Sequence, residues 1–207
     1  MPSTLVHVAV AGLVGTALLG RRFDGRAIAV VLAVAALPDL DAVVGLVLPG
    51  AHRSLLHSAV PVALAAAAIR ADARREASWL RGRYGDRGVR VAWVALAGVV
   101  CGGVLPDLFT NGVNLLYPLH DAFYTVDGEA LLSSERGFVQ TFVDLSAGGT
   151  PATTDTLHYS TGVDPAPGPE PDSVERVFPL ATSGLQLLLV VLGAFTVGTR
   201  LLESRGR

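Results

Sequence analysis

Two stretches decide how this sequence is interpreted, Leu37-Pro38-Asp39-Leu40-Asp41 and His52-Arg53-Ser54-Leu55-Leu56-His57-Ser58. Both place ionisable residues among apolar ones. A carboxylate near the middle of a membrane helix costs about 2.5–3.5 kcal/mol, so two of them are not expected to be idle. Proline interrupts the hydrogen-bond ladder of a helix, and broken backbone at membrane depth is tolerated where it lines a cavity. The two stretches therefore predict a polar pocket inside a membrane protein.

The composition agrees with a membrane protein. Of 207 residues, 51% are hydrophobic and only 16% are charged, whereas soluble domains have about 25% charged residues. The net charge of -2 gives no indication of nucleic-acid binding, and no nucleic-acid partner is expected. The single cysteine, Cys101, excludes an intramolecular disulfide framework and is expected to be a buried, inert thiol.

Hydropathy predicts an all-α integral membrane protein with about five membrane-spanning helices. A helix of about 20 apolar residues crosses the hydrocarbon core. The five candidates lie at roughly 4–20, 26–48, 54–69, 89–105 and 178–199. We expect three regions: residues 1–107 with helices one to four, an extracytoplasmic segment at 108–177, and residues 178–207 with the last helix and a basic tail.

Arginine, which supplies all 16 basic residues, predicts the orientation. Cytoplasmic connections of membrane proteins are enriched in basic residues. Arginines concentrate between spans one and two, between spans three and four, and after span five. This alternation predicts an extracytoplasmic N-terminus and a cytoplasmic C-terminus.

The long segment at 108–177 is acidic and mostly irregular in its expected structure. Turn-forming residues occur at 147–151 and 164–169, and residues 137–143 are expected to form one short strand. A segment of this length is usually functional or disordered. A cap over the pocket and a solvated linker are both open interpretations. We find no internal repeat in the chain.

The predicted topology brings six ionisable residues to one side of the membrane. The spans were placed from hydropathy and arginine alone, so this convergence supports a single site independently. The candidate metal ligands are His7, Asp39, Asp41, His52, His57 and Asp107.

Local geometry adds detail to this site. Residues two apart on a helix differ by about 200° in direction, so Asp39 and Asp41 need the break at Pro38 to face one point. His52 is expected in a loop, with Ser54 as a possible N-cap and His57 in the first turn of span three.

Imidazole and carboxylate groups together suit zinc, iron, manganese or nickel. A metal with an open position lowers the pKa of bound water, and Asp39 or Asp41 is a candidate general base for such a water. Arg53 is a candidate contact for a phosphate or carboxylate. Asn111 shares a helix face with Asp107 and is a second candidate for binding substrate.

Ordinary structural roles stay open for several of these residues. His7 and Arg53 suit a membrane interface, and Asp107 suits a helix cap. His120 and His158 are expected to be solvated in the outer segment.

The ordered set of these pieces resembles the membrane-bound metal-dependent hydrolase family of the YdjM type. The resemblance rests on His7, the segment 37–41, the segment 52–58, and the run from Asp107 through Asn111 to Pro118. It implies a helical membrane protein with metal-dependent hydrolase activity. The set is also similar to that of zinc-dependent phospholipase C and related nucleases, which implies zinc and a phosphoester substrate. The family usually has a histidine four residues before the last aspartate, where this chain has Gly103. His120 is a candidate replacement.

We therefore expect a membrane hydrolase that acts on a phosphoester at the extracytoplasmic face, with a lipid phosphoester as one candidate substrate. Two other functions stay open. An ion-coupled transporter would use Asp39 and Asp41 to bind a cation or relay protons. A catalytically inactive scaffold would bind a partner through its outer segment.

Overall fold

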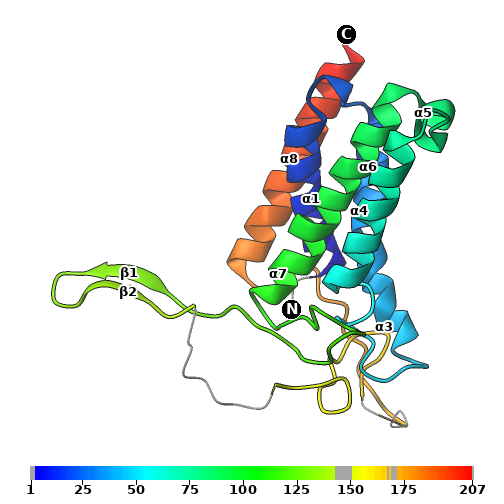
Figure 1. Ribbon diagram of the computed structural model, residues 1–207. Coiled ribbons are helices and arrows are strands. Elements are labelled where there is room, and N and C mark those ends of the chain that lie inside the picture. The colour runs from blue at the N-terminus through cyan, green and yellow to red at the C-terminus, as the bar shows by residue number, and fades with distance from the viewer. Residues whose placement is uncertain (1–2, 143–150, 167, 169–171, 207) are drawn as a thin grey trace.

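The computed structural model describes residues 3–142, 151–166, 168 and 172–206, and every structural statement below refers to them. Long helices lie side by side, and the outer segment gathers beneath one end of the bundle (Figure 1). Four stretches of helix are long and apolar enough to cross a membrane: Thr4–Arg22, Gly25–Val44, Asp86–Leu108 and Gly184–Arg205.

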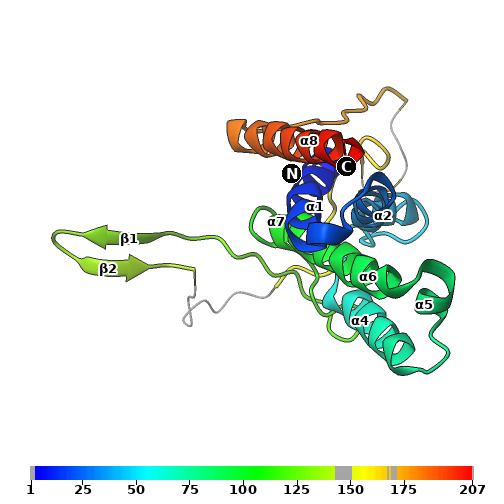
Figure 2. The same ribbon diagram turned by 90° about the horizontal axis from the view of Figure 1, so that it is seen from above.

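The central helix is α1, Thr4–Leu19. Ser3 caps its first turn by accepting a hydrogen bond from the backbone N–H of Val6. The helix packs against α2, α6 and α8, and Figure 2 shows it between them when the bundle is viewed from above. The last of these, α8 (Gly184–Arg205), begins later than the predicted residue 178. The central position of α1 places His7 inside the bundle.

The second spanning stretch is broken as Pro38 predicts. After a short 3₁₀ turn, η1 (Gly20–Arg22), the chain forms α2, Gly25–Ala35, which Asp24 caps. The 3₁₀ turn η2 (Leu37–Leu40) and the short helix α3 (Asp41–Val44) follow. Pro38 stands in the first turn of η2, where its missing N–H is tolerated. With this break, both Asp39 and Asp41 reach His57.

The stretch at 86–108 changes its helix type near its end. Helix α6 (Asp86–Gly98) passes into a π-helical segment, η3 (Val99–Val104), and then into α7 (Leu105–Leu108). Single π-helical turns are rare and often occur at functional sites. Both α7 and η2 consist of the tetrapeptide Leu-Pro-Asp-Leu. The same tetrapeptide therefore stands in both of these spanning stretches.

The predicted third span corresponds to α4, Ala59–Arg74, which runs beside α6 (Figure 1). At 16 residues it is shorter than the four candidate spans, so the count of five spanning helices is not confirmed. It also begins later than expected. The N-cap is Ser58 rather than Ser54, and His57 precedes the helix instead of lying in its first turn. A short helix, α5 (Trp79–Tyr84), connects α4 to α6.

The outer segment is mostly irregular, as predicted. Strands β1 (Ala130–Ser133) and β2 (Gly137–Gln140) form an antiparallel hairpin that extends away from the bundle in Figures 1 and 2. The sequence analysis expected only the second strand, with a longer range. The turn expected at 147–151 lies almost wholly outside the described residues, and the one at 164–169 lies partly outside them. The all-α prediction is thus correct except for this hairpin.

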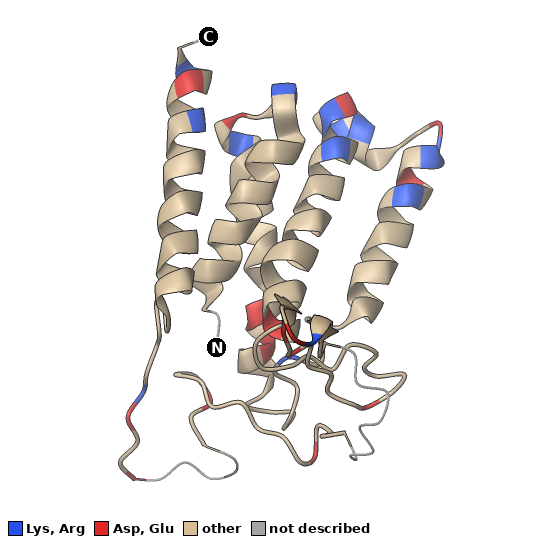
Figure 3. Cartoon of the chain, turned by 90° about the vertical axis from the view of Figure 1, so that its left-hand side faces the viewer, with Lys and Arg blue, Asp and Glu red and all other residues tan. Residues whose placement is uncertain are grey.

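The two ends of the bundle differ in charge. Figure 3 shows most of the basic positions of the bundle at one end, with some acidic positions among them, and a group of acidic positions at the other end. Between the two ends lies an apolar core that includes Ala11, Val31, Ala35 and Val94. The six candidate ligands lie at the end opposite the arginines, which agrees with their predicted convergence on one side.

Candidate metal centre

Two helix pairs build the site in the same way. In the first pair α1 carries His7 near its start, and α2 leads into the Leu-Pro-Asp-Leu turn with Asp39. In the second pair His57 stands two residues before α4, and α6 leads into the Leu-Pro-Asp-Leu turn with Asp107. Each pair therefore contributes one histidine and one aspartate to the same end of the bundle.

These four side chains converge so that each histidine faces both aspartates. Asp39 Oδ1 lies 3.2 Å from His7 Nδ1 and 3.5 Å from His57 Nε2. Asp107 lies 3.4 Å from each histidine, through Oδ1 to His7 Nε2 and through Oδ2 to His57 Nε2. Ligand atoms of His7, Asp39 and His57 all lie within 4.8 Å of one another. Donor atoms around a tetrahedral zinc are about 3.3 Å apart, because each zinc–ligand bond is about 2.0 Å.

Several of these buried atoms have no hydrogen-bond partner among the described residues. Both ring nitrogens of His7, His57 Nε2 and Asp39 Oδ2 are unpaired. His7, His57 and Asp107 are at most 1% exposed, and Asp39 is 19% exposed. Buried polar atoms are normally paired, so these unpaired donor atoms need an explanation. A cation held among them would supply one, and the residues present fit a metal ion.

The charges of the cluster are also unbalanced. Asp39, Asp41 and Asp107 stand against a single buried arginine, Arg53. With neutral histidines, two negative charges remain uncompensated. Isolated buried charge is very costly unless it is paired or coordinates a metal. A divalent cation would balance this charge, as would protonation of both His7 and His57.

Asp41 lies behind the cluster rather than in it, and both of its oxygens are occupied. Oδ1 accepts from His52 Nδ1 at 2.7 Å, and Oδ2 accepts from His57 Nδ1 at 2.8 Å and from the backbone N–H of Arg53 at 3.0 Å. Because an ionised carboxylate can only accept, His57 carries its proton on Nδ1 and presents the Nε2 lone pair to the cluster. Such carboxylate–histidine pairs orient metal ligands in proteins.

Arg53 is fixed from several directions. Its side chain is buried, and Nη2 donates to Asp107 Oδ1 at 2.8 Å. Its backbone has φ of 61°, in the left-handed region that non-glycine residues rarely occupy. The N–H donates to Asp41, and the carbonyl accepts from the backbone of Asn114 at 2.9 Å. Nε and Nη1 have no partner among the described residues. Arg53 therefore pairs with a carboxylate of the chain itself, and two more of its donor groups have no partner among the described residues.

Tyr159 of the outer segment closes over this arginine, which the sequence analysis did not foresee. The guanidinium lies 4.7 Å from the centre of the Tyr159 ring, and the hydroxyl donates to the carbonyl of Asn111 at 2.7 Å. Burial raises the pKa of the Tyr159 hydroxyl, although the Arg53 charge offsets part of this effect. The phenol is thus a neutral donor. Tyr159 shows that part of the outer segment packs against the site.

The outer segment is held in place by a second set of polar contacts. Asp121 accepts from the side chain of Asn114 at 2.6 Å and from the hydroxyl of Thr154 at 2.6 Å. Burial alone raises the pKa of Asp121, but hydrogen bonds from Thr154 and Asn114 outweigh it and hold the pKa below its usual value. Asn114 is fully buried. These contacts join residues 114–121 to the stretch that leads to Tyr159, which favours the cap interpretation.

Other candidate residues lie apart from the cluster. The Asn111 side chain is exposed, and only its backbone carbonyl takes part, through Tyr159. His120 is exposed and faces the ring of Tyr124, so it does not replace the missing family histidine. His158 is 21% exposed, with Nδ1 3.9 Å from Asp164 Oδ2. Gly103 is buried in η3, and a Cβ there would lie 3.8 Å from Pro38 Cγ. Cys101 is half-buried.

A cavity of about 490 Å³ opens beside the cluster. Its polar wall is formed by site residues, including His7, Asp39 and Arg53. The facing wall comes from residues 160–163 and 177–180, where Phe178 and Leu180 are apolar. Ligand pockets typically measure about 300–1,000 Å³ and combine apolar walls with a few polar groups. The cavity is therefore large enough to hold a small substrate or one end of a larger one.

A comparison with protein families gives the relationship of the chain. The model described as "YdjM inner membrane protein" matches residues 1–161, which include both helix pairs, Arg53 and Tyr159. The chain belongs to this family. The match confirms the predicted family, and the YdjM family assignment together with the four long apolar helices makes the chain a membrane protein. No curated protein and no solved structure matches the chain.

Proposed function

We propose that the protein is a membrane-bound, metal-dependent hydrolase that acts on a phosphoester. The observation that carries this proposal is the convergence of His7, Asp39, His57 and Asp107, with donor atoms that lack other partners. Two histidines and two carboxylates suit a divalent metal, and zinc is the first candidate among several.

The residues of the site would have two kinds of role, binding the ion and orienting its ligands. His7, His57, Asp39 and Asp107 would hold the ion, and Asp41 would position His57 by keeping the Nδ1 proton in place. This positioning role replaces the ligand and base roles predicted for Asp41, because both its oxygens already accept hydrogen bonds. When bound, a divalent metal makes water acidic enough to serve as a nucleophile near neutral pH.

Asp39 is the better candidate for the general base. Its Oδ2 has no hydrogen-bond partner, and its side chain, at 19% exposed, lines the cavity. A carboxylate in that position can accept a proton from water next to the substrate. Arg53 would bind the phosphoryl oxygens through its unpaired Nε and Nη1 groups, since guanidinium matches phosphate geometry. The substrate-binding role predicted for Asn111 is not supported by its exposed position.

The cavity favours an amphipathic substrate. Polar groups line the wall beside the cluster, while Val177, Phe178 and Leu180 line the facing wall. A phosphoester that carries an apolar chain would satisfy both walls, which is why a lipid is preferred over a fully water-soluble substrate. The arginines at the opposite end of the bundle favour an extracytoplasmic position for the site. We likewise propose a cytoplasmic C-terminus, because arginines also follow the last helix.

The transporter alternative receives less support. A transporter needs a polar route to both faces of the membrane. Among the described residues, an apolar core containing Val31, Ala35 and Val94 separates the cluster from the arginine-rich end. Asp39 lines a cavity on the side away from the arginine-rich end, and Asp41 is fully buried.

Hydrolysis of a labelled phosphodiester by the detergent-purified protein tests this proposal. We expect activity that a chelator removes and added zinc restores, and that His57→Ala abolishes. His120→Ala is the matched control, because His120 is an exposed histidine outside the cluster. Equal rates in wild type and His57→Ala, or activity insensitive to chelation, would overturn the proposed reaction.

A further inference from the structure

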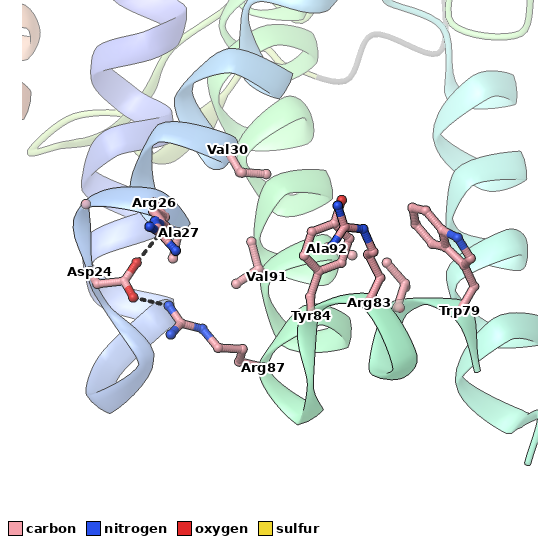
Figure 4. Close-up of a pocket in the computed structure, with 13 residues that line it drawn as sticks. Asp24, Arg26, Ala27, Val30, Trp79, Arg83, Tyr84, Arg87, Val91 and Ala92 are labelled. Carbon is pink, nitrogen blue, oxygen red and sulfur yellow. Dashed lines mark hydrogen bonds and ion pairs between the residues drawn. The ribbon is translucent and has the colours of Figure 1, made fainter. Parts of the chain in front are cut away.

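A second groove lies at the other end of the bundle, away from the metal centre. It measures about 1080 Å³ and is lined by α2, α5 and α6, as Figure 4 shows. We propose that it binds one anionic phospholipid from the membrane leaflet at the arginine-rich end. The proposal rests on the membrane location of the chain and does not depend on the hydrolase function.

The rim of the groove carries excess positive charge. Arg26, Arg83 and Arg87 line it together with a single carboxylate, Asp24. Asp24 is already engaged, because it pairs with Arg87 and accepts from the backbone N–H of Ala27. Arg26 and Arg83 have no carboxylate partner among the described residues, and both are exposed. Each of these guanidinium groups is suited to a phosphate, which guanidinium binds with paired hydrogen bonds.

The walls of the groove are apolar. Ala27 and Val30 of α2 face Val91 and Ala92 of α6 across it, and Leu80 of α5 adds a further contact. The floor is close-packed, since a Cβ on Gly88 would lie only 2.7 Å from the carbonyl of Leu80. Walls of this kind exclude a hydrated ion but accept an acyl chain.

Two aromatic residues mark the level of the membrane surface. Trp79 and Tyr84 of α5 line the groove, are 65% and 53% exposed, and pack edge to face at 5.7 Å between ring centres. The Arg83 guanidinium lies 5.7 Å from the centre of the Tyr84 ring. Tryptophan and tyrosine gather at the headgroup level of membrane proteins. The arginine rim therefore stands at headgroup level, and the apolar walls extend from it along the helices.

These features select a phospholipid over other occupants. A free phosphate would use the rim and leave the apolar walls exposed. A helix of a second copy would cover the walls and leave Arg26 and Arg83 without counter-charge. An anionic phospholipid satisfies both parts of the groove at once.

Native mass spectrometry of the full-length protein tests this directly. The protein is released from micelles that contain equal amounts of phosphatidylglycerol and phosphatidylcholine. We expect wild type to retain phosphatidylglycerol preferentially, and the double variant Arg26→Gln/Arg83→Gln to lose at least about tenfold of that retention, as the loss of two basic contacts near a membrane surface implies. Arg21→Gln/Arg74→Gln is the matched control, because it removes the same charge at the same end, outside the groove.

A second pair of variants tests the apolar part without changing charge. Val30→Trp fills the groove from a wall residue that is 45% exposed, and Val43→Trp makes the same change at a residue that is 50% exposed and lies outside the groove. We expect only Val30→Trp to remove the retained lipid. An excess of inorganic phosphate is expected not to displace it.

Three results would overturn the proposal. The first is equal retention of the two lipids, or an equal loss in both arginine double variants, which would indicate general charge attraction. The second is displacement by inorganic phosphate, which would indicate a soluble-anion site. The third is a lipid-free dimer that Val30→Trp dissociates, which would assign the groove to a second copy of the chain.

Discussion

The two Leu-Pro-Asp-Leu turns use the same four residues in different surroundings. The turn with Asp39 follows a break in α2, and its carboxylate is 19% exposed and lines the cavity. The turn with Asp107 follows a π-helical segment, and its carboxylate is 1% exposed and bound by Arg53. Both aspartates face the same two histidines. The comparison shows that one tetrapeptide can deliver a partly exposed carboxylate or a buried one that is paired with an arginine.

The two aspartates differ in whether an arginine is paired with them. This difference predicts the largest change in stability among the variants below. Asp107→Asn leaves the buried Arg53 without its ion-pair partner, which should cost about 3–5 kcal/mol of stability. Asp39→Asn removes no arginine pair, so its effect on folding should be much smaller, while both variants should lose metal. Thermal unfolding in detergent, with metal content measured on the same samples, checks this. Equal destabilisation by the two variants would show that the two turns are equivalent.

Variants of the two adjacent glycines of η3 test how closely this segment packs against α1, next to the turn with Asp107. A Cβ on Gly102 would lie 2.5 Å from the carbonyl of His7, whereas one on Gly103 would meet only Pro38 Cγ at 3.8 Å. Gly102→Ala must therefore push α1 and His7 away, which should cost about 1–3 kcal/mol. Gly103→Ala should be neutral or slightly stabilising. If both variants unfold at the wild-type temperature, the close packing of α1 on η3 is wrong.

Asp41 orients His57 without belonging to either Leu-Pro-Asp-Leu turn's pair of facing aspartates. Asp41→Asn cannot accept from both histidines, so His57 loses its fixed orientation. Metal affinity should fall about 10–100-fold, as for other residues that orient metal ligands. Competition with a chromogenic chelator measures this. A complete loss of metal, equal to that of His57→Ala, would instead make Asp41 a direct ligand.

Tyr159 should show the smallest effect. Removing its ring from Arg53 should cost about 0.5–2 kcal/mol, the range of cation–π contacts. Tyr159→Phe keeps the ring and loses only the bond to the Asn111 carbonyl, so it should retain most of that stability. Unfolding curves of Tyr159→Ala and Tyr159→Phe separate the two contributions. A Tyr159→Ala variant as stable as wild type would indicate that the outer segment does not cap the site.

Much of the fold could be predicted from sequence, because hydropathy and arginine respond to the membrane directly. Hydropathy predicts where each helix crosses the membrane, and the arginines predict which side each helix end faces. These two signals were enough to place His7, Asp39, His57 and Asp107 on one side. The break at Pro38 was also predictable, since proline lacks the N–H that a helix needs.

The remaining features depend on tertiary contacts that carry no periodic signal. Tyr159 lies in an irregular segment, so nothing in its sequence neighbourhood indicates that it covers Arg53. The hydrogen bonds of Asp41 with His52 and His57 depend on the path that the backbone takes after Pro38. The position of His57 before α4, instead of within it, depends on where the backbone of residues 51–58 turns. The repeated tetrapeptide is visible in the sequence, but only the structure shows that its two aspartates face the same two histidines.

The metal content of the purified protein tests the central claim most directly. Wild type, His7→Ala, His57→Ala and the control His120→Ala are purified in the same detergent and analysed by elemental mass spectrometry. We expect about one divalent ion per chain in wild type and in His120→Ala, and little or none in the other two, because each helix pair supplies one histidine ligand. Equal, substoichiometric metal in all four proteins would contradict a metal centre shared between the two helix pairs.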